Sequence, residues 1–206
     1  MIPSFENIRL KYNKSIHFKN KTKALYDDMD SKYSAAADFY GFKCTGCEDN
    51  CCFTRFHHYT FIEYFYLLDG FDALDHGKKM EIKNRADALC KKLNEADKKG
   101  ILTKLMCPLN DNSLCVLYPY RPMICRLHGV PHELNMPGQG ARHNPGCDYF
   151  MKQHGSKDYF RFDRTAIYLE MANLEKEFRQ KTGVTNKIKL TVAEMISDYH
   201  FLAKAS

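Results

Sequence analysis

The sequence predicts a mainly α-helical protein that forms a single domain over residues 1–206, with a small β-hairpin and irregular cysteine-bearing loops organised around metal. Apolar residues recur at helical spacing in several long segments, which predicts the helices. Four of the nine cysteines fall between Cys44 and Cys52, although free cysteines normally enter cores singly. Turn-forming residues at 110–113 separate two short apolar runs, which predicts the hairpin.

The first half of the chain is expected to hold an irregular arm followed by helices. Residues 1–19 are polar and predict the arm. A helix is predicted over residues 20–40, with Gly41 as its C-terminal stop. A second long helix is predicted from about Gly77 to Lys99, again followed by a glycine.

A short aromatic helix is predicted between these two, from Phe61 to about Leu68, with Gly70 as its stop. The sequence Thr60-Phe-Ile-Glu63 indicates a capping box, in which a hydroxyl and a carboxylate cover the free amides of the first turn. His57 and His58 precede this helix. Because so many thiols are nearby, we expect these histidines to pack or to support metal ligands rather than to bind metal.

The hairpin would bring Cys107 and Cys115 together, and Pro122 suits the first turn of a short helix that carries Cys125. Residues 128–146 are rich in Gly and Pro and predict a long functional loop, which ends at Cys147. These segments complete a cysteine-cluster core at about residues 41–150.

The C-terminal part, at about residues 158–204, is expected to be helical. Apolar residues from Ile167 to Phe178 keep helical spacing, and Gly183 is the expected stop. A second capping box, Thr191-Val-Ala-Glu194, predicts a last helix that runs to about Ala203.

Composition places this fold among ordinary globular proteins, at 44% hydrophobic and 27% charged residues. No apolar run reaches the roughly 18 residues of a membrane helix, and the first ten residues lack the apolar stretch of a signal peptide. We therefore expect a cytoplasmic protein without a membrane partner. In a reducing compartment its cysteines would bind metal rather than form disulfides.

The net charge of +6 is spread along the chain, without an arginine-rich arm or an aromatic-plus-glycine RNA-binding pattern. The expected partner is therefore another protein or a small molecule, and not nucleic acid.

The predicted metal ligands are eight cysteines. Cys90 is left out because it lies in an apolar helical stripe and is expected to be a small core residue. Neither cysteine region alone has the spacing for two complete sites, so we expect the two regions to meet and share a metal. The predicted ligands are Cys44, Cys47, Cys51, Cys52, Cys107, Cys115, Cys125 and Cys147.

The number of thiolates alone does not identify the metal. They could form two closed four-cysteine zinc sites or hold one or two iron–sulfur clusters, and metal-free thiol chemistry is a third reading. Arg121 and Arg126 flank Cys125. Their guanidinium groups are expected either to offset the charge of the thiolates or to hold an anionic substrate or cofactor beside the metal.

The combined pattern resembles the YkgJ-type cysteine-cluster proteins, which are described as zinc- or iron-chelating. The resemblance spans about residues 41–150 and rests on three motifs: C-x-x-C-x-x-x-C-C at 44–52, Cys107 followed by Cys115-x-x-Tyr118-x-x-Arg121-Pro122-x-x-Cys125-Arg126, and the late Cys147.

That resemblance implies an iron–sulfur cluster with a redox or protein-modifying role. One branch of the family is similar to the flagellin lysine N-methylases, which use S-adenosylmethionine and carry an iron–sulfur cluster. The alternatives are therefore a lysine N-methylase-like enzyme and a zinc-stabilised structural or protein-interaction module with two four-cysteine sites. A metal store or chaperone with labile thiolates is a further possibility. The sequence assigns no catalytic residue.

Overall fold

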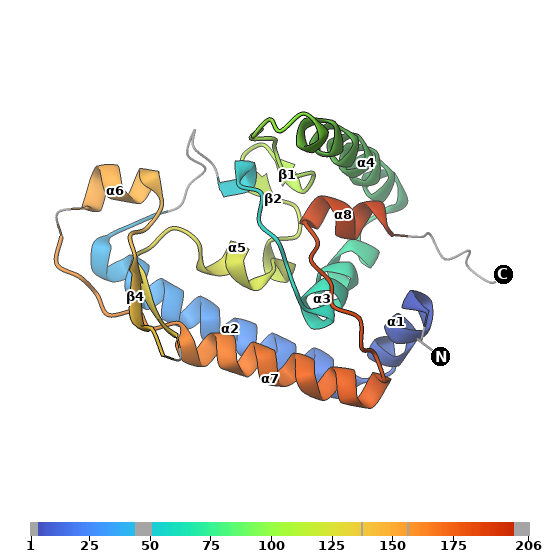
Figure 1. Ribbon diagram of the computed structural model, residues 1–206, viewed down its shortest axis with the longest axis horizontal. Helices are drawn as coiled ribbons and strands as arrows, with labels where there is room; N and C mark the ends of the chain where they lie inside the picture. Colours follow the sequence, from blue (N-terminus) through green and yellow to red (C-terminus); the bar gives the residue numbers. More distant parts are fainter. Residues whose placement is uncertain (1–3, 44–50, 137, 156, 200–206) are drawn as a thin grey trace.

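The computed structural model describes residues 4–43, 51–136, 138–155 and 157–199, and its described part is mainly helical (Figure 1). The elements, in chain order, are α1 (Phe5–Asn13), α2 (Ile16–Tyr40), the 3-10 helix η1 (Cys51–Phe53), α3 (Phe61–Asp72), α4 (His76–Lys98), β1 (Asn110–Asp111), β2 (Leu114–Cys115), the 3-10 helix η2 (Tyr118–Tyr120), α5 (Met123–Leu127), β3 (His132–Met136), β4 (Gly140–Asn144), α6 (Asp148–His154), α7 (Thr165–Thr182) and α8 (Val192–Ser197).

The long helices α2 and α7 run alongside each other and form one side of the molecule (Figure 1). Both stop where the sequence predicts. Gly41 and Gly183 follow them in the left-handed conformation, with φ of 66° and 75°, and glycine adopts this conformation without steric cost. One connected cluster of buried side chains extends from Ile8 to Tyr199 and packs these helices onto α3.

The expected irregular arm at residues 1–19 is wrong, because α1 and the start of α2 occupy most of it. Ser4 caps α1 by accepting a hydrogen bond from the Asn7 amide. Ile8 and Tyr12 are buried, and Arg9 forms an ion pair with Asp72 of α3. Contacts with the rest of the fold therefore stabilise α1, whose polar sequence alone did not predict a helix.

Helix α3 continues through Gly70, so the predicted stop at this glycine is wrong. A Cβ atom at Gly70 would lie 2.4 Å from the ring of Tyr120 in η2. The glycine therefore allows η2 to pack closely on α3. The predicted capping box is half present: the Thr60 hydroxyl accepts from the Glu63 amide at 3.2 Å. The Glu63 carboxylate instead accepts from the Thr60 hydroxyl and from the Met123 amide of α5.

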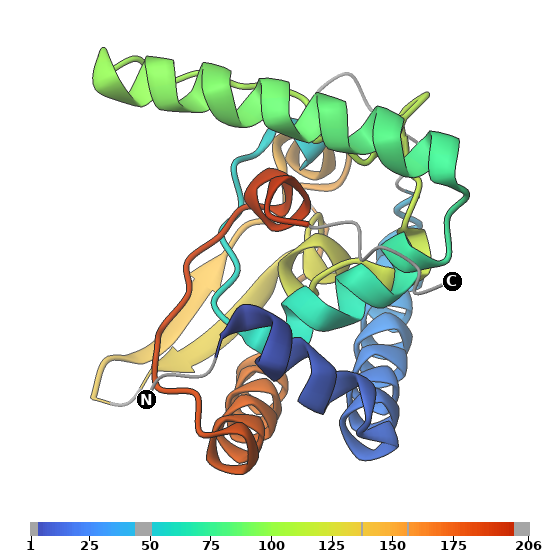
Figure 2. The ribbon, with the colours of Figure 1, turned by 90° about the vertical axis from the view of Figure 1, so that its right-hand side faces the viewer.

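Helix α4 lies across one end of the molecule, with α8 packed beneath it (Figure 2). The capping box that begins α8 is confirmed: the Thr191 amide donates to Glu194 and the Glu194 amide donates to Thr191. The predicted end near Ala203 is wrong. Helix α8 ends at Ser197, and residues 200–203 lie outside the described part.

Two antiparallel hairpins complete the fold. In the first, β1 pairs with β2 as predicted, and Asn112 and Ser113 occupy the turn with φ of 49° and 69°, as a type I′ turn requires. The second, β3 with β4, lies in the stretch that the sequence predicts as a long functional loop. That prediction is therefore wrong for residues 132–136 and 140–144, which form strands. Of the helices that the structure describes, none combines enough length with enough apolar character for a membrane crossing.

Candidate metal centre

Six of the eight predicted ligands line one pocket. It has a volume of about 160 Å³, and all six cysteines are half-buried. Cys90 is not among the residues that line it. Cys44 and Cys47 lie outside the described residues. The lining cysteines are Cys51, Cys52, Cys107, Cys115, Cys125 and Cys147.

The two cysteine regions meet through their backbones. The amide of Cys107 donates a hydrogen bond of 2.9 Å to the carbonyl oxygen of Cys52, which lies in η1. Cys115 ends β2, so the hairpin returns it toward Cys107. Cys125 lies on α5 and lines the same pocket as the hairpin cysteines. Segments far apart in the sequence thus surround one pocket, as the cysteine spacing predicts.

Cys147 reaches the pocket through a close backbone approach. Its amide donates a hydrogen bond of 2.8 Å to the carbonyl oxygen of Gly129, just after α5. A Cβ atom at Gly146 would lie 2.4 Å from that same oxygen, so only glycine fits there. Cys147 also caps α6, because its sulfur accepts from the Phe150 amide. The residues on both sides of this cysteine therefore fix its place.

The deeper thiols are protonated at neutral pH when no cation is present. Burial raises the pKa of Cys115 to about 11 and that of Cys125 to about 12, and it also raises the pKa of Cys107 well above its usual value. The charges that these thiols would carry also raise one another's pKa. A cation among them would reverse this preference, because opposite charge favours the thiolate.

Cys52 differs from the deeper thiols. A hydrogen bond from the Cys51 side chain lowers the pKa of Cys52 to about 6, and Asn110 and the charge of Arg121 act in the same direction. The rim of the pocket toward η1 therefore carries a thiolate at neutral pH.

The positive charge of Arg121 favours the thiolate form of three of these cysteines. It lowers the pKa of Cys52, Cys115 and Cys125. Its guanidinium stacks on the ring of Tyr118 at 3.6 Å and donates to the carbonyl oxygen of the same residue. This arrangement fits the predicted charge-offsetting role.

The guanidinium of Arg126 connects several elements of the fold. Its guanidinium donates to the Asp30 carboxylate of α2 and to the carbonyl oxygens of Pro119 and Arg121, and it stacks on Tyr26. Only 4% of the residue is exposed. These contacts join α2, η2 and α5 around Cys125, whereas a cofactor-binding role for Arg126 stays a prediction.

His58 lies in the same pocket and is buried, with 2% of its surface exposed. Within the described part of the chain, neither ring nitrogen has a hydrogen-bond partner. Nδ1 lies 3.9 Å from Oε1 of Glu63. Burial lowers the pKa of His58 to about 4, so the ring is neutral at pH 7. Paired backbone hydrogen bonds with Leu190 fix its position.

The rest of the lining is mainly apolar and comes from η1, α4, α8 and the connecting segments. Such walls exclude water and strengthen electrostatic interactions inside the pocket. The larger apolar side chains of the lining are Phe42, Phe53, Phe56, Leu89, Leu93, Leu105, Leu109 and Leu114.

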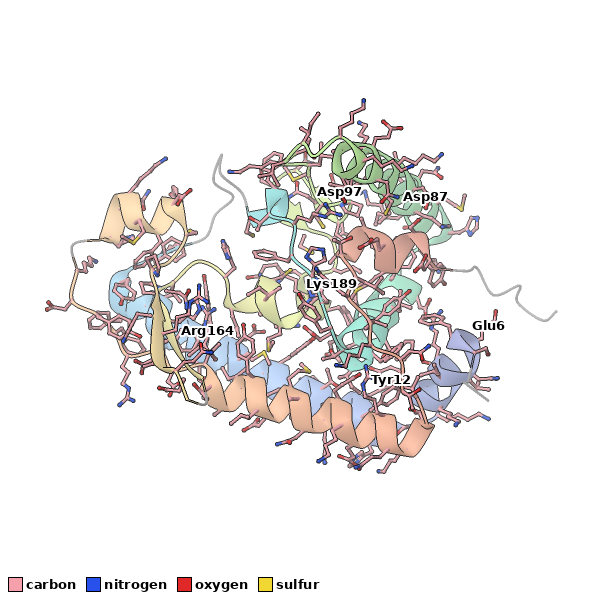
Figure 3. All side chains as sticks on the ribbon, in the orientation of Figure 1. Glu6, Tyr12, Asp87, Asp97, Arg164 and Lys189 are labelled. Carbon is pink, nitrogen blue, oxygen red and sulfur yellow. The ribbon has the colours of Figure 1, made fainter. Side chains whose placement is uncertain are left out.

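Sequence reasoning missed Arg164, which lies between α5 and the β3–β4 hairpin (Figure 3). It is 1% exposed, and its Nε has no hydrogen-bond partner among the described residues. Its Nη2 donates to the carbonyl oxygens of Leu127 and Val130, at the C-terminal end of the helix that carries Cys125. In the sequence Arg164 stands close to Arg161 and Asp163, and nothing in this short charged stretch indicates the role.

Among the described residues, no three Cys, His, Asp or Glu side chains form a group that could hold a metal ion. The pocket is lined by soft thiols together with the imidazoles of His58 and His128, and these donors suit zinc or iron–sulfur chemistry and not magnesium or calcium. The residues thus fit the expected class of metal by chemistry, and the ligand roles of the eight cysteines stay predictions.

The sequence matches no protein-family model and no curated protein, and the structure matches no solved structure. The YkgJ-type resemblance therefore stays a prediction.

Proposed function

We propose that this chain is a metal-binding cysteine-cluster protein whose pocket holds an iron–sulfur cluster with a redox or protein-modifying role. The observation that supports the proposal is the meeting of Cys52 with Cys107, Cys115 and Cys125 around one pocket. Packing alone does not require so many half-buried thiols in one place, because free cysteines usually enter cores singly.

Iron–sulfur clusters take up to four cysteine ligands, and they supply one-electron transfer when bound. In this proposal the cysteines of both regions hold the cluster. Arg121 offsets part of the negative charge, and the apolar walls exclude water. Because Cys107, Cys115 and Cys125 are protonated without a cation, loading the site is expected to release protons. A small molecule or another protein that reaches this pocket is the expected partner.

The zinc alternative uses the same thiols for a structural or protein-interaction role. Two closed four-cysteine zinc sites would stabilise the loops and carry no chemistry. The pocket that cysteines of α5, the β1–β2 hairpin and η1 line in common favours this alternative equally, because a structural ion would hold these short elements in place.

Purification without oxygen separates the two. The iron–sulfur proposal predicts brown protein that contains iron and acid-labile sulfide and bleaches in air, since sulfur-to-iron charge transfer absorbs visible light. Zinc is d¹⁰ and gives colourless protein. Colourless anaerobic protein with tightly bound zinc, and no labile sulfide after cluster reconstitution, would replace the proposal with the zinc alternative. Protein that binds neither metal would overturn both.

A further inference from the structure

His58 is a donor-capable side chain that the eight-cysteine set leaves unused. Its ring is buried in the pocket that the cysteines line, and neither ring nitrogen has a hydrogen-bond partner in the described part of the chain. A buried polar group without a partner costs free energy, so an imidazole kept in this state calls for an explanation.

Glu63 faces one side of the ring. Its Oε1 lies 3.9 Å from Nδ1 of His58 and also accepts a hydrogen bond of 2.9 Å from the Met123 amide. Met123 is the first residue of α5, the helix that carries Cys125. One buried carboxylate therefore connects His58 to the helix of a predicted metal ligand.

Carboxylate, imidazole and metal in series is a recurring arrangement in metalloproteins. The carboxylate receives the N–H of one ring nitrogen and fixes the tautomer, which leaves the lone pair of the other nitrogen for the metal. His58 and Glu63 have the composition and the order of this arrangement. The sequence motifs gave no reason to single out His58 over its neighbour His57. Of these two histidines, only His58 lines the pocket.

We propose that His58, directed by Glu63, adds a nitrogen donor to the predicted cysteine ligands and binds the metal through Nε2. The inference rests on the proposed metal-binding function and adds to it a nitrogen ligand. No three described side chains already form a metal-binding group, so loading must draw the donors together. The Nδ1–Oε1 distance is then expected to shorten from 3.9 Å to a hydrogen bond.

The first test uses the unmodified chain, labelled with ¹⁵N in its histidine rings and titrated with Zn²⁺ alone without oxygen. The expected result is a large shift of one ring nitrogen of His58, together with slow exchange of the proton on the other. The rings of His57 and of the other histidines outside the pocket serve as internal controls, whereas His128 lines the pocket and is not one of them. Unchanged His58 nitrogens in a protein that has taken up zinc would overturn the inference and leave the proposed function standing. A chain that takes up no zinc in this titration and contains no iron after anaerobic purification would overturn both.

Variants give a second readout. His58→Ala is expected to weaken Zn²⁺ binding at least tenfold, and Glu63→Gln by about 10- to 100-fold, as for other groups that orient a metal-bound histidine. Gln keeps an oxygen that can accept from the Met123 amide, so α5 retains its contact. The matched control is His57→Ala, with expected affinity equal to that of the wild type. Equal weakening in the His57 and His58 variants would contradict a specific role for His58.

Discussion

The amide nitrogen of Cys107 donates a hydrogen bond of 2.9 Å to the carbonyl oxygen of Cys52, and this bond joins the two cysteine regions of the chain. It places the β1–β2 hairpin beside η1, and the pocket that holds the other cysteines forms at this junction. The contact is made by backbone atoms. It therefore survives replacement of either thiol, which allows the thiols to be tested one at a time.

Cys90 provides the control for every such test. It lies on α4, outside the pocket, and it is half-buried rather than the core residue that the sequence predicts. Cys90→Ser is expected to keep the full metal content of the wild type and to lower the free energy of unfolding by about 1 kcal/mol or less. Metal analysis and denaturant unfolding check the two parts. Loss of metal in this variant would show that the ligands are divided wrongly.

Gly70→Ala is expected to destabilise the protein by about 1–3 kcal/mol, because the new Cβ would overlap the ring of Tyr120. In a Tyr120→Ala background the same change should cost less, because the ring is gone and only the contact of 2.9 Å with the Cβ of residue 120 remains. Denaturant unfolding of the two single variants and the double variant measures this coupling. Equal costs of Gly70→Ala in both backgrounds would contradict the close approach of η2 and α3.

Arg164→Met is expected to lower the free energy of unfolding by about 1–3 kcal/mol, because it leaves the buried carbonyl oxygens of Leu127 and Val130 without their donor. Arg164→Lys keeps a donor and should cost less. Since Gly129, between these carbonyls, accepts from the Cys147 amide, hydrogen exchange at Cys147 should also accelerate in the Met variant. An unchanged exchange rate at the Cys147 amide would show that Arg164 does not help to position Cys147.

Stability of the metal-free protein should fall as the pH drops from about 6.5 to about 4. Burial lowers the pKa of His58 from 6.5 to about 4, so in this window the unfolded chain binds a proton that the folded chain does not. The loss should reach up to about 3 kcal/mol, at 1.36 kcal/mol per pKa unit. His58→Gln should show a shallower dependence when both proteins are unfolded with denaturant in the presence of a chelator. Parallel pH profiles would contradict a buried neutral His58.

Short sequence motifs correctly predicted where several helices begin or end and where the first hairpin turns. Gly41 and Gly183 end α2 and α7, the Thr191–Glu194 box begins α8, and the turn at Asn112 and Ser113 forms the first hairpin. Each of these signals acts within a few residues, so the sequence alone contains it.

Features that depend on distant partners escaped prediction. Helix α1 is held by buried contacts and by the pairing of Arg9 with Asp72, which its own sequence does not reveal. Gly70 has the appearance of a helix stop until Tyr120 is placed against it. Likewise, the Thr60–Glu63 motif did not show that the carboxylate would turn to Met123. For the candidate site, cysteine spacing predicted the meeting of the two regions, whereas His58 and Arg164 became recognisable only through their surroundings.

A metal centre that draws ligands from both cysteine regions can be detected through the metal content per chain after anaerobic purification. The wild type is compared with one variant from each region, Cys52→Ser and Cys115→Ser. A shared centre requires metal in the wild type and loss of that same metal from both variants, while Cys90→Ser retains it. Wild-type protein without bound metal, or loss of different metals from the two variants, would show that the two regions share no centre.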